Sequence, residues 1–339
     1  MKVCVTGANG FVGSNLCQAL LGQGDEVCGL VRRTSDLQFI KSLPQVRVYF
    51  GDLTERKSLL PAFENCSVVY HVAALTSDWG PWDQFKAINI NGVRSVMEAA
   101  IACKVKRVVH ISSVSVYGFP GASQMAESDR WVSRPDDPYV TSKQEGEKVA
   151  LSYSGDQLEV VVIRPAGIYG PNDRTTTLKL LPEIEKRKFP YIDGGRYLMG
   201  PLYVDNLVQA ILLAGQKRGV AGQAYHIADD GKTTWRQYVE EFCNHLSCPK
   251  PLLSVPSRLA WPVACLVERV AKLVGKVEAP PLTKYRVRAV MNDSHFSIKK
   301  AKKELGYRPE VTTREGIRRT VAWYREYQQQ TQQEKGGVA

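Results

Sequence analysis

The first half of the chain alternates short runs rich in β-branched residues with stretches that have the apolar spacing of helices. The runs predict strands at 2–6, 26–31, 46–50, 67–72, 107–112 and 159–164, and the stretches predict helices near 13–22, 59–63, 82–103 and 138–154. Strands that alternate with helices in this way form a parallel sheet with helices on both faces. The pattern therefore predicts an α/β protein whose ligand binds at the carboxyl ends of the strands.

The pattern is less regular after Pro165. Strand-like runs at 189–192, 202–204 and 223–227 mix with helical stretches near 178–188, 205–214, 234–245 and 259–274. Thr312 and Glu315 have capping-box spacing and predict a last helix that ends near Tyr327. We therefore expect a first domain over residues 1–170, to whose sheet later residues add strands, a smaller α/β region over 171–327, and a disordered Gln-rich tail over 328–339.

Composition places the chain among ordinary globular proteins, with 44% hydrophobic and 23% charged residues. No apolar run approaches the roughly 18 residues that a membrane span needs. The eight cysteines lack CxxC spacing, and several stand inside apolar patterns. We therefore expect free thiols, no metal site and a reducing, cytoplasmic location.

The net charge of +11 is compatible with nucleic acid, an anionic membrane surface, or an anionic cofactor or substrate. The basic residues are dispersed except for a cluster at 299–303, and no nucleic-acid-reading motif accompanies them. We expect no nucleic-acid partner and interpret the cluster as a solvated basic helix.

Three glycines with a spacing of three residues follow the first predicted strand and precede a helix. Glycine permits a tight turn and a close backbone approach to a pyrophosphate, and the helix N-terminus presents free N–H groups to the phosphates. The motif therefore predicts a dinucleotide site that includes Gly7, Asn9, Gly10, Phe11, Val12 and Gly13.

Arg32 and Arg33 follow the second predicted strand, where NAD-preferring proteins usually carry an acidic residue. Arginines can pair with the 2′-phosphate of NADP(H), so we favour NADP(H), with NAD(H) as the alternative if both arginines are only solvated. Further cofactor contacts are expected at the ends of the third and fourth strands, from Asp52, Leu53, Val72, Ala73 and Ala74.

Tyr139 and Lys143 stand four residues apart in a predicted helix, so the ammonium can lie near the phenol and lower its pKa from about 10. Ser113 ends the fifth predicted strand and points into the same cleft, where its hydroxyl could hold a substrate oxygen. Taken alone, the Tyr–Lys spacing is typical of a surface pair. Downstream of the glycine motif and the strand-end serine, it predicts general acid–base catalysis.

These motifs, with Asn89-Ile90-Asn91-Gly92 and the stretch Arg164 to Pro171, resemble the extended short-chain dehydrogenase/reductases from Met1 to about Tyr327. The resemblance implies a Rossmann-type doubly wound sheet with a smaller C-terminal substrate-binding region. It implies Ser113 as substrate-oxygen donor, Tyr139 as acid and base, and Lys143 as ribose ligand and pKa modulator. It further implies that Asn89 supports a proton relay, that Pro165 and Ile168 contact the nicotinamide, and that a homodimer forms through the helices at 89–102 and 139–154.

Two departures from family patterns narrow the expected reaction. Val114 and Ser115 replace the Asp-Glu pair of the sugar-nucleotide dehydratases, and Met199 stands where the epimerases carry an arginine for the diphosphate. The stretches after Pro280 and Asp293 resemble the 3β-hydroxysteroid dehydrogenase branch, which includes sterol-4-carboxylate 3-dehydrogenases and 2-alkyl-3-oxoalkanoate reductases. The resemblance implies a hydrophobic alcohol or ketone such as a steroid, terpenoid or lipid.

Two alternatives remain open at this point. A sugar-nucleotide epimerase or reductase is compatible with the sequence if Arg174 or Arg187 replaces the missing arginine. A nicotinamide-sensing protein without turnover is the second alternative, although such proteins tend to lose the Tyr–Lys pair.

The helix at 259–274 carries an apolar stripe that includes Val263, Leu266 and Val270. Such a stripe is typical of a core-facing helix, and it also fits the wall of a lipid pocket. Because basic residues accompany the stripe, a peripheral contact with a membrane surface is a further hypothesis.

Overall fold

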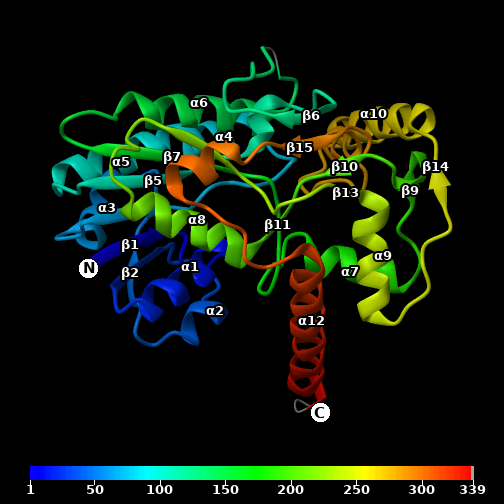
Figure 1. The fold of residues 1–339 in the computed structure, drawn as a ribbon, viewed down its shortest axis with the longest axis horizontal. Coiled ribbons are helices and arrows are strands. Elements are labelled where there is room, and N and C mark those ends of the chain that lie inside the picture. The colour runs from blue at the N-terminus through cyan, green and yellow to red at the C-terminus, as the bar shows by residue number, and fades with distance from the viewer. Residues whose placement is uncertain (134, 337–339) are drawn as a thin grey trace.

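A seven-stranded parallel sheet forms the centre of the structure (Figure 1). The computed structural model describes residues 1–133 and 135–336. The order of the sheet is β12-β7-β5-β4-β1-β2-β3, and every neighbouring pair is parallel. Its strands are β1 (Lys2–Thr6), β2 (Glu26–Val31), β3 (Arg47–Phe50), β4 (Val68–His71), β5 (Arg107–Ile111), β7 (Glu159–Pro165) and β12 (Ala224–Ile227). The expected α/β fold with a doubly wound parallel sheet is confirmed.

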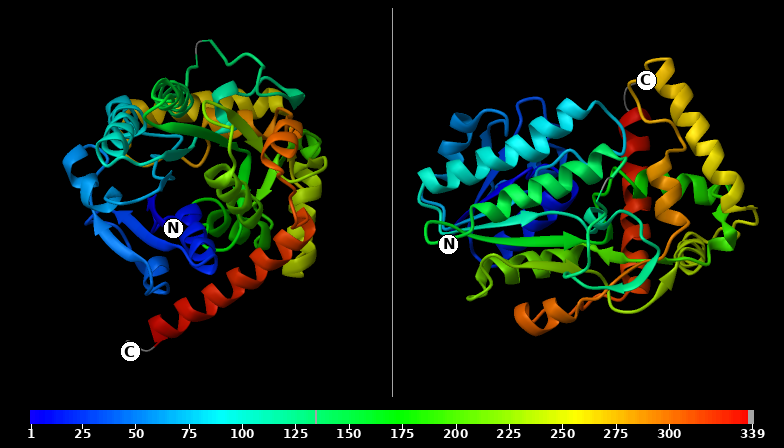
Figure 2. Two further views of the ribbon diagram at one scale, coloured as in Figure 1. Left: turned by 60° about the vertical axis from the view of Figure 1, so that its left-hand side comes forward. Right: turned by 90° about the horizontal axis from the view of Figure 1, so that it is seen from above.

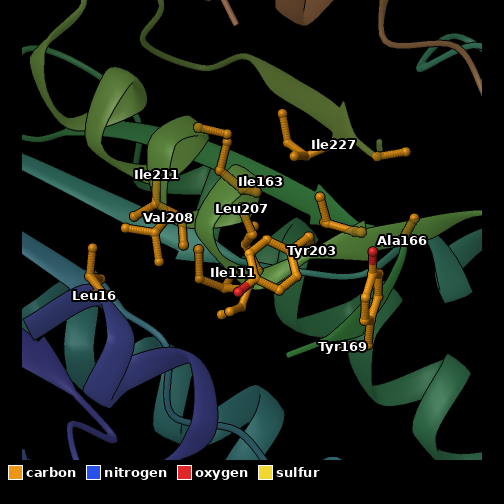
Figure 3. Close-up of a cluster of buried hydrophobic side chains, with 14 of the residues drawn as sticks. Leu16, Ile111, Ile163, Ala166, Tyr169, Tyr203, Leu207, Val208, Ile211 and Ile227 are labelled. Atoms are coloured by element: carbon orange, nitrogen blue, oxygen red, sulfur yellow. The ribbon is translucent and has the colours of Figure 1, made fainter. Parts of the chain in front are cut away.

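Helices cover both faces of the sheet, as Figure 2 shows. One face is covered by α1 (Phe11–Gly22) and α8 (Val204–Gln216), and the other by α3 (Arg56–Phe63), α5 (Gly92–Ala102) and α6 (Pro138–Ser152). Strands buried on both sides are apolar at almost every position, which is why their sequences read as continuous runs. Figure 3 shows part of the first face, where Leu207, Val208 and Ile211 of α8 lie among Ile111, Ile163 and Ile227 of the sheet.

The strand order reverses between β1 and β4, which are paired from Val3 with Val68 to Thr6 with His71. In open α/β sheets, ligands bind outside the carboxyl ends of the strands at such a reversal. The glycine turn after β1 and the small residues after β4 therefore meet at the expected position for a ligand.

Short strand pairs and helices lie beside the carboxyl edge of the sheet, mostly from the C-terminal region, with β6 and β8 contributed by residues before 171. The pairs are β6 (Ala122–Met125) with β15 (Ser294–Phe296), β8 (Gly167–Tyr169) with β11 (Pro201–Tyr203), β9 (Tyr191–Ile192) with β14 (Ser254–Val255), and β10 (Leu198–Met199) with β13 (Thr233–Thr234). The longer helices are α7 (Thr177–Glu185), α9 (Trp235–Leu246), α10 (Ser257–Leu273) and α11 (Lys284–Val290). The remaining helical segments are short: α2 (Gln38–Lys41), α4 (Trp82–Phe85), a π-helix η1 (Lys86–Asn91), η2 (Val114–Tyr117), η3 (Asp193–Gly195) and η4 (Ala301–Leu305).

The last helix, α12 (Thr313–Gly336), is longer than the sequence predicts. The expectation that the helix ends near Tyr327 is wrong, and the expected disordered tail is helical up to residue 336. Glutamine is a good helix former, and hydrogen bonds such as Thr331 Oγ1 to the Tyr327 carbonyl (2.8 Å) accompany the extra turns. Residues 337–339 of the predicted tail lie outside the described residues.

Candidate active site

The turn between β1 and α1 is built on its three glycines. Gly7 has a φ of 69°, and the Gly10 N–H donates to the Gly7 carbonyl at 2.9 Å. A Cβ atom at Gly13 would lie 2.1 Å from the Gly7 carbonyl oxygen, and one at Gly7 would lie 3.0 Å from Cα of Ala73. The turn is therefore packed so closely, on itself and on the loop after β4, that only glycine fits at positions 7 and 13.

The N-terminus of α1 opens toward the reversal point of the sheet. Gly10 is its N-cap, no side chain caps the first turn, and no acidic residue stands there. The free N–H groups and the positive end of the helix dipole suit a phosphate group. This cradle fits the pyrophosphate of a dinucleotide, as the sequence predicts for Gly7 to Gly13.

Arg32 and Arg33 are exposed in the loop after β2, and the Arg33 guanidinium lies 5.6 Å from the centre of the Phe50 ring. Asp52 lies after β3, where one of its carboxylate oxygens accepts hydrogen bonds from the backbone N–H and the hydroxyl of Thr54. The two arginine side chains are thus accessible to an anion. The Asp52 carboxylate, in contrast, is also engaged in hydrogen bonds within the turn that follows β3.

Asp36, in the same loop as Arg32 and Arg33, forms an ion pair with Arg174. The sequence did not predict this contact. Arg174 also stacks over Phe39 at 4.0 Å, and the Asn9 amide donates to the Asp36 carbonyl at 3.1 Å. Arg174 holds the pKa of the Asp36 carboxyl below its usual value. The pair joins the loop after β2 to the loop after β8, and no local spacing could have revealed that contact.

Tyr139 lies in the first turn of α6, where the Asp137 carboxylate caps the helix by accepting from the N–H groups of Tyr139 (2.9 Å) and Val140 (3.2 Å). Burial raises the pKa of the Tyr139 phenol, and the neighbouring Ser113 and Ser115 hydroxyls oppose that shift. Ser113 follows β5 and caps η2 by accepting from the Ser115 N–H at 3.0 Å. Ser113 and Tyr139 therefore meet as predicted.

The Lys143 side chain is buried, and its Nζ donates to the Ile111 carbonyl at 2.7 Å. Burial lowers the pKa of Lys143 to about 8, against the opposing effect of Glu147. Burial lowers the pKa values of His71 and His110, and the Lys143 charge lowers both further, which places the lysine beside the carboxyl ends of β4 and β5. The sequence predicts that Lys143 lowers the Tyr139 pKa, whereas in the protein alone burial raises that pKa and the groups that oppose the rise are the Ser113 and Ser115 hydroxyls, not Lys143.

Asn89 lies in the π-helix η1, a kind of irregular turn that is frequent at functional sites. Its side chain pairs with both backbone groups of Leu75 (2.8 and 2.9 Å) and donates to the Ser142 hydroxyl (2.9 Å). A Cβ atom at Gly146 would lie 2.2 Å from the Asn89 carbonyl oxygen, so α6 packs directly on this turn. Asn89 thus fixes the loop after β4 against α6, and its role in a proton relay stays a prediction.

The remaining predicted contact residues lie in segments at the carboxyl edge of the sheet. Val72, Ala73 and Ala74 follow β4, Pro165 ends β7, and Ile168 lies in the middle of β8. Leu53 is buried against Gly92 at the start of α5. Each of these residues stays a predicted cofactor contact.

A buried polar network centres on Glu147, two turns along α6 from Tyr139. Glu147 of α6 accepts three hydrogen bonds from the Arg164 guanidinium, at 2.6 to 3.1 Å, and one from the Ser112 hydroxyl. The Tyr117 hydroxyl contacts Arg164 and lies 2.8 Å from Nε2 of His226. The network ties α6 to the segment after β5, to β7 and to β12, and it includes Arg164 and Tyr117.

Stability is expected to fall as the pH drops below 6.5. Burial lowers the pKa values of His71 and His226 to about 3, and that of His110 falls well below its usual value. The unfolded chain takes up these protons near pH 6.5 whereas the folded protein does not, so each histidine removes about 1.4 kcal/mol per pH unit below 6.5. Asp137 and Asp229, whose pKa values burial raises to about 6, offset part of the loss. Denaturation series from pH 7 to 5 on the wild type and on His71→Asn test this, and an unchanged slope in the variant would contradict it.

A cavity of about 1100 Å³ opens beside Tyr139. It is bounded by the start of α6, by the segment after η2, by the loop at Trp79 and by residues of α10 and α11. Tyr139 lies just behind the lining, with its ring 5.9 Å from that of Tyr285, which lines the cavity. The aromatic and apolar lining includes Trp79, Pro81, Phe119, Pro120, Trp131, Val132 and Tyr285.

The fold is a Rossmann-type α/β fold, and it brings the glycine turn, Ser113 and Tyr139 to the carboxyl edge of its sheet. The chain belongs to the NAD dependent epimerase/dehydratase family, whose model matches residues 3–228. The resemblance to the extended short-chain dehydrogenase/reductases is thereby confirmed.

Individual relatives agree with the expected branch. The chain is 31% identical to a 4-hydroxy-2-methyl-3-oxo-4-farnesyl-3,4-dihydroquinoline-1-oxide ketoreductase of Stigmatella aurantiaca, over 94% of this chain and 95% of the relative. It is 28% identical to a decarboxylating sterol-4-alpha-carboxylate 3-dehydrogenase of Mus musculus, over 94% and 90% of the two chains. A solved UDP-glucose 4-epimerase of Thermotoga maritima matches with a TM-score of 0.77 over 96% and 99% of the chains, and at 22% identity that likeness shows the fold alone.

Proposed function

We propose that this protein is an NADP(H)-linked oxidoreductase that interconverts a secondary alcohol and a ketone on a hydrophobic substrate. The observation that carries the proposal is the position of the Tyr139 phenol, which lies beside the Ser113 hydroxyl at the carboxyl edge of the sheet and next to the large cavity. A phenol and a hydroxyl in this arrangement can hold and protonate the oxygen of a bound carbonyl.

In the proposed reaction the Ser113 hydroxyl orients the substrate oxygen, and Tyr139 donates its proton to that oxygen or takes it back. A bound nicotinamide supplies or accepts the hydride. Because burial raises the pKa of Tyr139, the phenol is protonated at neutral pH, which suits the direction of carbonyl reduction. The buried Lys143 ammonium, held by the Ile111 carbonyl, supplies positive charge beside the site.

A hydrophobic substrate is supported by the cavity and by the relatives. Five aromatic side chains, from Trp79, Tyr117, Phe119, Trp131 and Tyr285, line a space larger than a short-chain ketone requires. The names of two relatives refer to a farnesyl-substituted quinoline and to a sterol, both of which are bulky and apolar.

A sugar-nucleotide substrate is the second candidate. It is favoured by Arg130, Lys272 and Lys276, which line the cavity and could meet a diphosphate. Met199, in contrast, is buried in β10 and offers no charge.

A substrate screen separates the two candidates. NADPH oxidation is expected with sterol, terpenoid or β-keto lipid ketones and not with nucleotide sugars, and UDP is expected to leave the melting temperature unchanged. A large stabilisation by UDP would favour the sugar-nucleotide function, because only a ligand of the folded state raises stability.

The cofactor preference depends on Arg32 and Arg33. Replacing both with alanine is expected to weaken NADPH binding about 100-fold and NADH binding less than about threefold, because only NADPH carries the 2′-phosphate. Calorimetric titration measures both affinities. The control is Arg314→Ala with Arg318→Ala, which removes the same charge from exposed positions of α12. Equal losses for both cofactors would contradict the preference.

A further inference from the structure

The apolar stripe of α10 faces outward from the protein. It consists of seven large side chains, five on α10 (Leu259, Val263, Leu266, Val270 and Leu273) and two just beyond its end (Val274 and Val277). Leu266 is 62% exposed, Leu273 79% and Val277 90%. Figure 2 (right) shows α10, in yellow, at the outer edge of the molecule. The interpretation of this stripe as a core-facing surface is therefore wrong.

The buried side of α10 explains this orientation. It carries Ala260, Ala264 and Ala271, whose small side chains let the helix pack closely on α11. Glu268 is also buried, and it accepts a hydrogen bond from the backbone N–H of Lys284. The small and acidic residues thus face the protein, together with Trp261, which packs against the same cluster, whereas the seven large side chains of the stripe face away from it. This polarity is the reverse of that of an ordinary surface helix.

Basic side chains follow one side of the stripe. Arg258 and Arg269 are exposed and stand eleven residues apart, so they lie on one side of α10, and the exposed Lys276 follows just beyond the end of the helix. The one acidic residue within α10, Glu268, faces inward, and Glu278 stands beyond its end. In a two-fold pairing through this face, a second copy of this chain would present the same basic row, with no exposed acidic residue of α10 to meet it. An anionic lipid surface, in contrast, complements both the apolar stripe and the basic row.

The stripe continues to the rim of the cavity. Lys272, Gly275, Lys276 and Val277 line the cavity, and Val277 is also the last residue of the stripe. A membrane or protein that covers the stripe would therefore also lie at the mouth of the cavity. In the proposed function, a substrate reaches Tyr139 through this cavity.

We propose that the apolar stripe of α10 lies in the surface of an anionic membrane and opens the substrate cavity toward the lipid. Among the described residues, no helix is long and apolar enough to cross a membrane, so the contact is one of a helix lying in the plane of the interface. The delivery of an apolar substrate from the lipid rests on the proposed function, whereas membrane binding itself does not.

Vesicle flotation tests the proposal on the full-length protein. The wild type is expected to float with vesicles of equal parts phosphatidylcholine and phosphatidylglycerol, to bind phosphatidylcholine vesicles at least tenfold more weakly, and to be released by high salt. Leu266→Gln with Leu273→Gln is expected to weaken binding to the mixed vesicles about 100-fold, roughly tenfold for each leucine withdrawn from the lipid. Both side chains are exposed and glutamine is a good helix former, so the fold is retained.

A matched pair of charge variants separates a local effect from net charge. Arg258→Gln with Arg269→Gln is expected to weaken binding at least tenfold, whereas Lys299→Gln with Lys303→Gln, on η4 and the segment before it, is expected to change it less than twofold. Equal effects of the two pairs, or no flotation of the wild type, would overturn the proposal. So would a vesicle-free dimer that the leucine substitutions dissociate, because the stripe would then be covered by a second copy. Flotation requires no turnover, so its failure leaves the proposed reaction untouched, and loss of the reaction leaves the membrane contact untouched.

Discussion

Turnover is expected to fall about 10²–10⁴-fold in Tyr139→Phe, with cofactor affinity nearly unchanged. The substitution removes only the phenolic oxygen that faces Ser113 and Ser115. The aromatic ring stays, and with it the packing against Tyr285 at 5.9 Å. Single-turnover assays with a ketone that the screen identifies measure the first effect, and titration with NADPH measures the second.

Tyr153→Phe is the matched control for this experiment. Tyr153 is the C-cap of the same helix, and its hydroxyl contacts Glu98 far from the cofactor turn. Its substitution makes the same chemical change and is expected to leave turnover within about twofold. If Tyr139→Phe retained full turnover, the phenol would not be the proton donor, and the proposed acid–base role of Tyr139 would be wrong.

The second large effect is expected on stability, from Arg164→Met. Glu147 is fully buried, and Arg164 provides three of the four hydrogen bonds that it accepts from side chains. Removing the guanidinium leaves a buried carboxylate without its counter-charge, which costs about 3–5 kcal/mol of unfolding free energy. Chemical denaturation at neutral pH measures the loss.

Two comparisons isolate the buried pair. Arg56→Met breaks the half-exposed pair with Glu98 and is expected to cost less than about 1 kcal/mol. Adding Glu147→Met to Arg164→Met is expected to recover most of the lost stability, because it removes the uncompensated charge. The network would not depend on this charge pair if Arg164→Met were as stable as the wild type. The same would follow if the double variant were no more stable than Arg164→Met.

Local spacing predicted the elements that carry the site. The strands of the sheet begin and end within one residue of their expected positions, because their apolar runs are bounded by turn residues. The glycine turn, Ser113 and Tyr139 were found for the same reason: each follows a strand end or begins a helix, and the parallel sheet brings those ends to one edge. Short elements made by long-range pairing, such as β6 with β15, carry no comparable local signal.

The sequence by itself thus determined the α/β fold, the glycine turn after the first strand and the meeting of Ser113 with Tyr139. Only the tertiary structure decided that Asp36 pairs with Arg174, that burial raises the Tyr139 pKa, and that the stripe of α10 faces outward. The physical reason is that periodicity specifies which side chains share a face of a helix or strand. What that face contacts depends on where distant segments pack, and so do the burial and the charge that each side chain experiences.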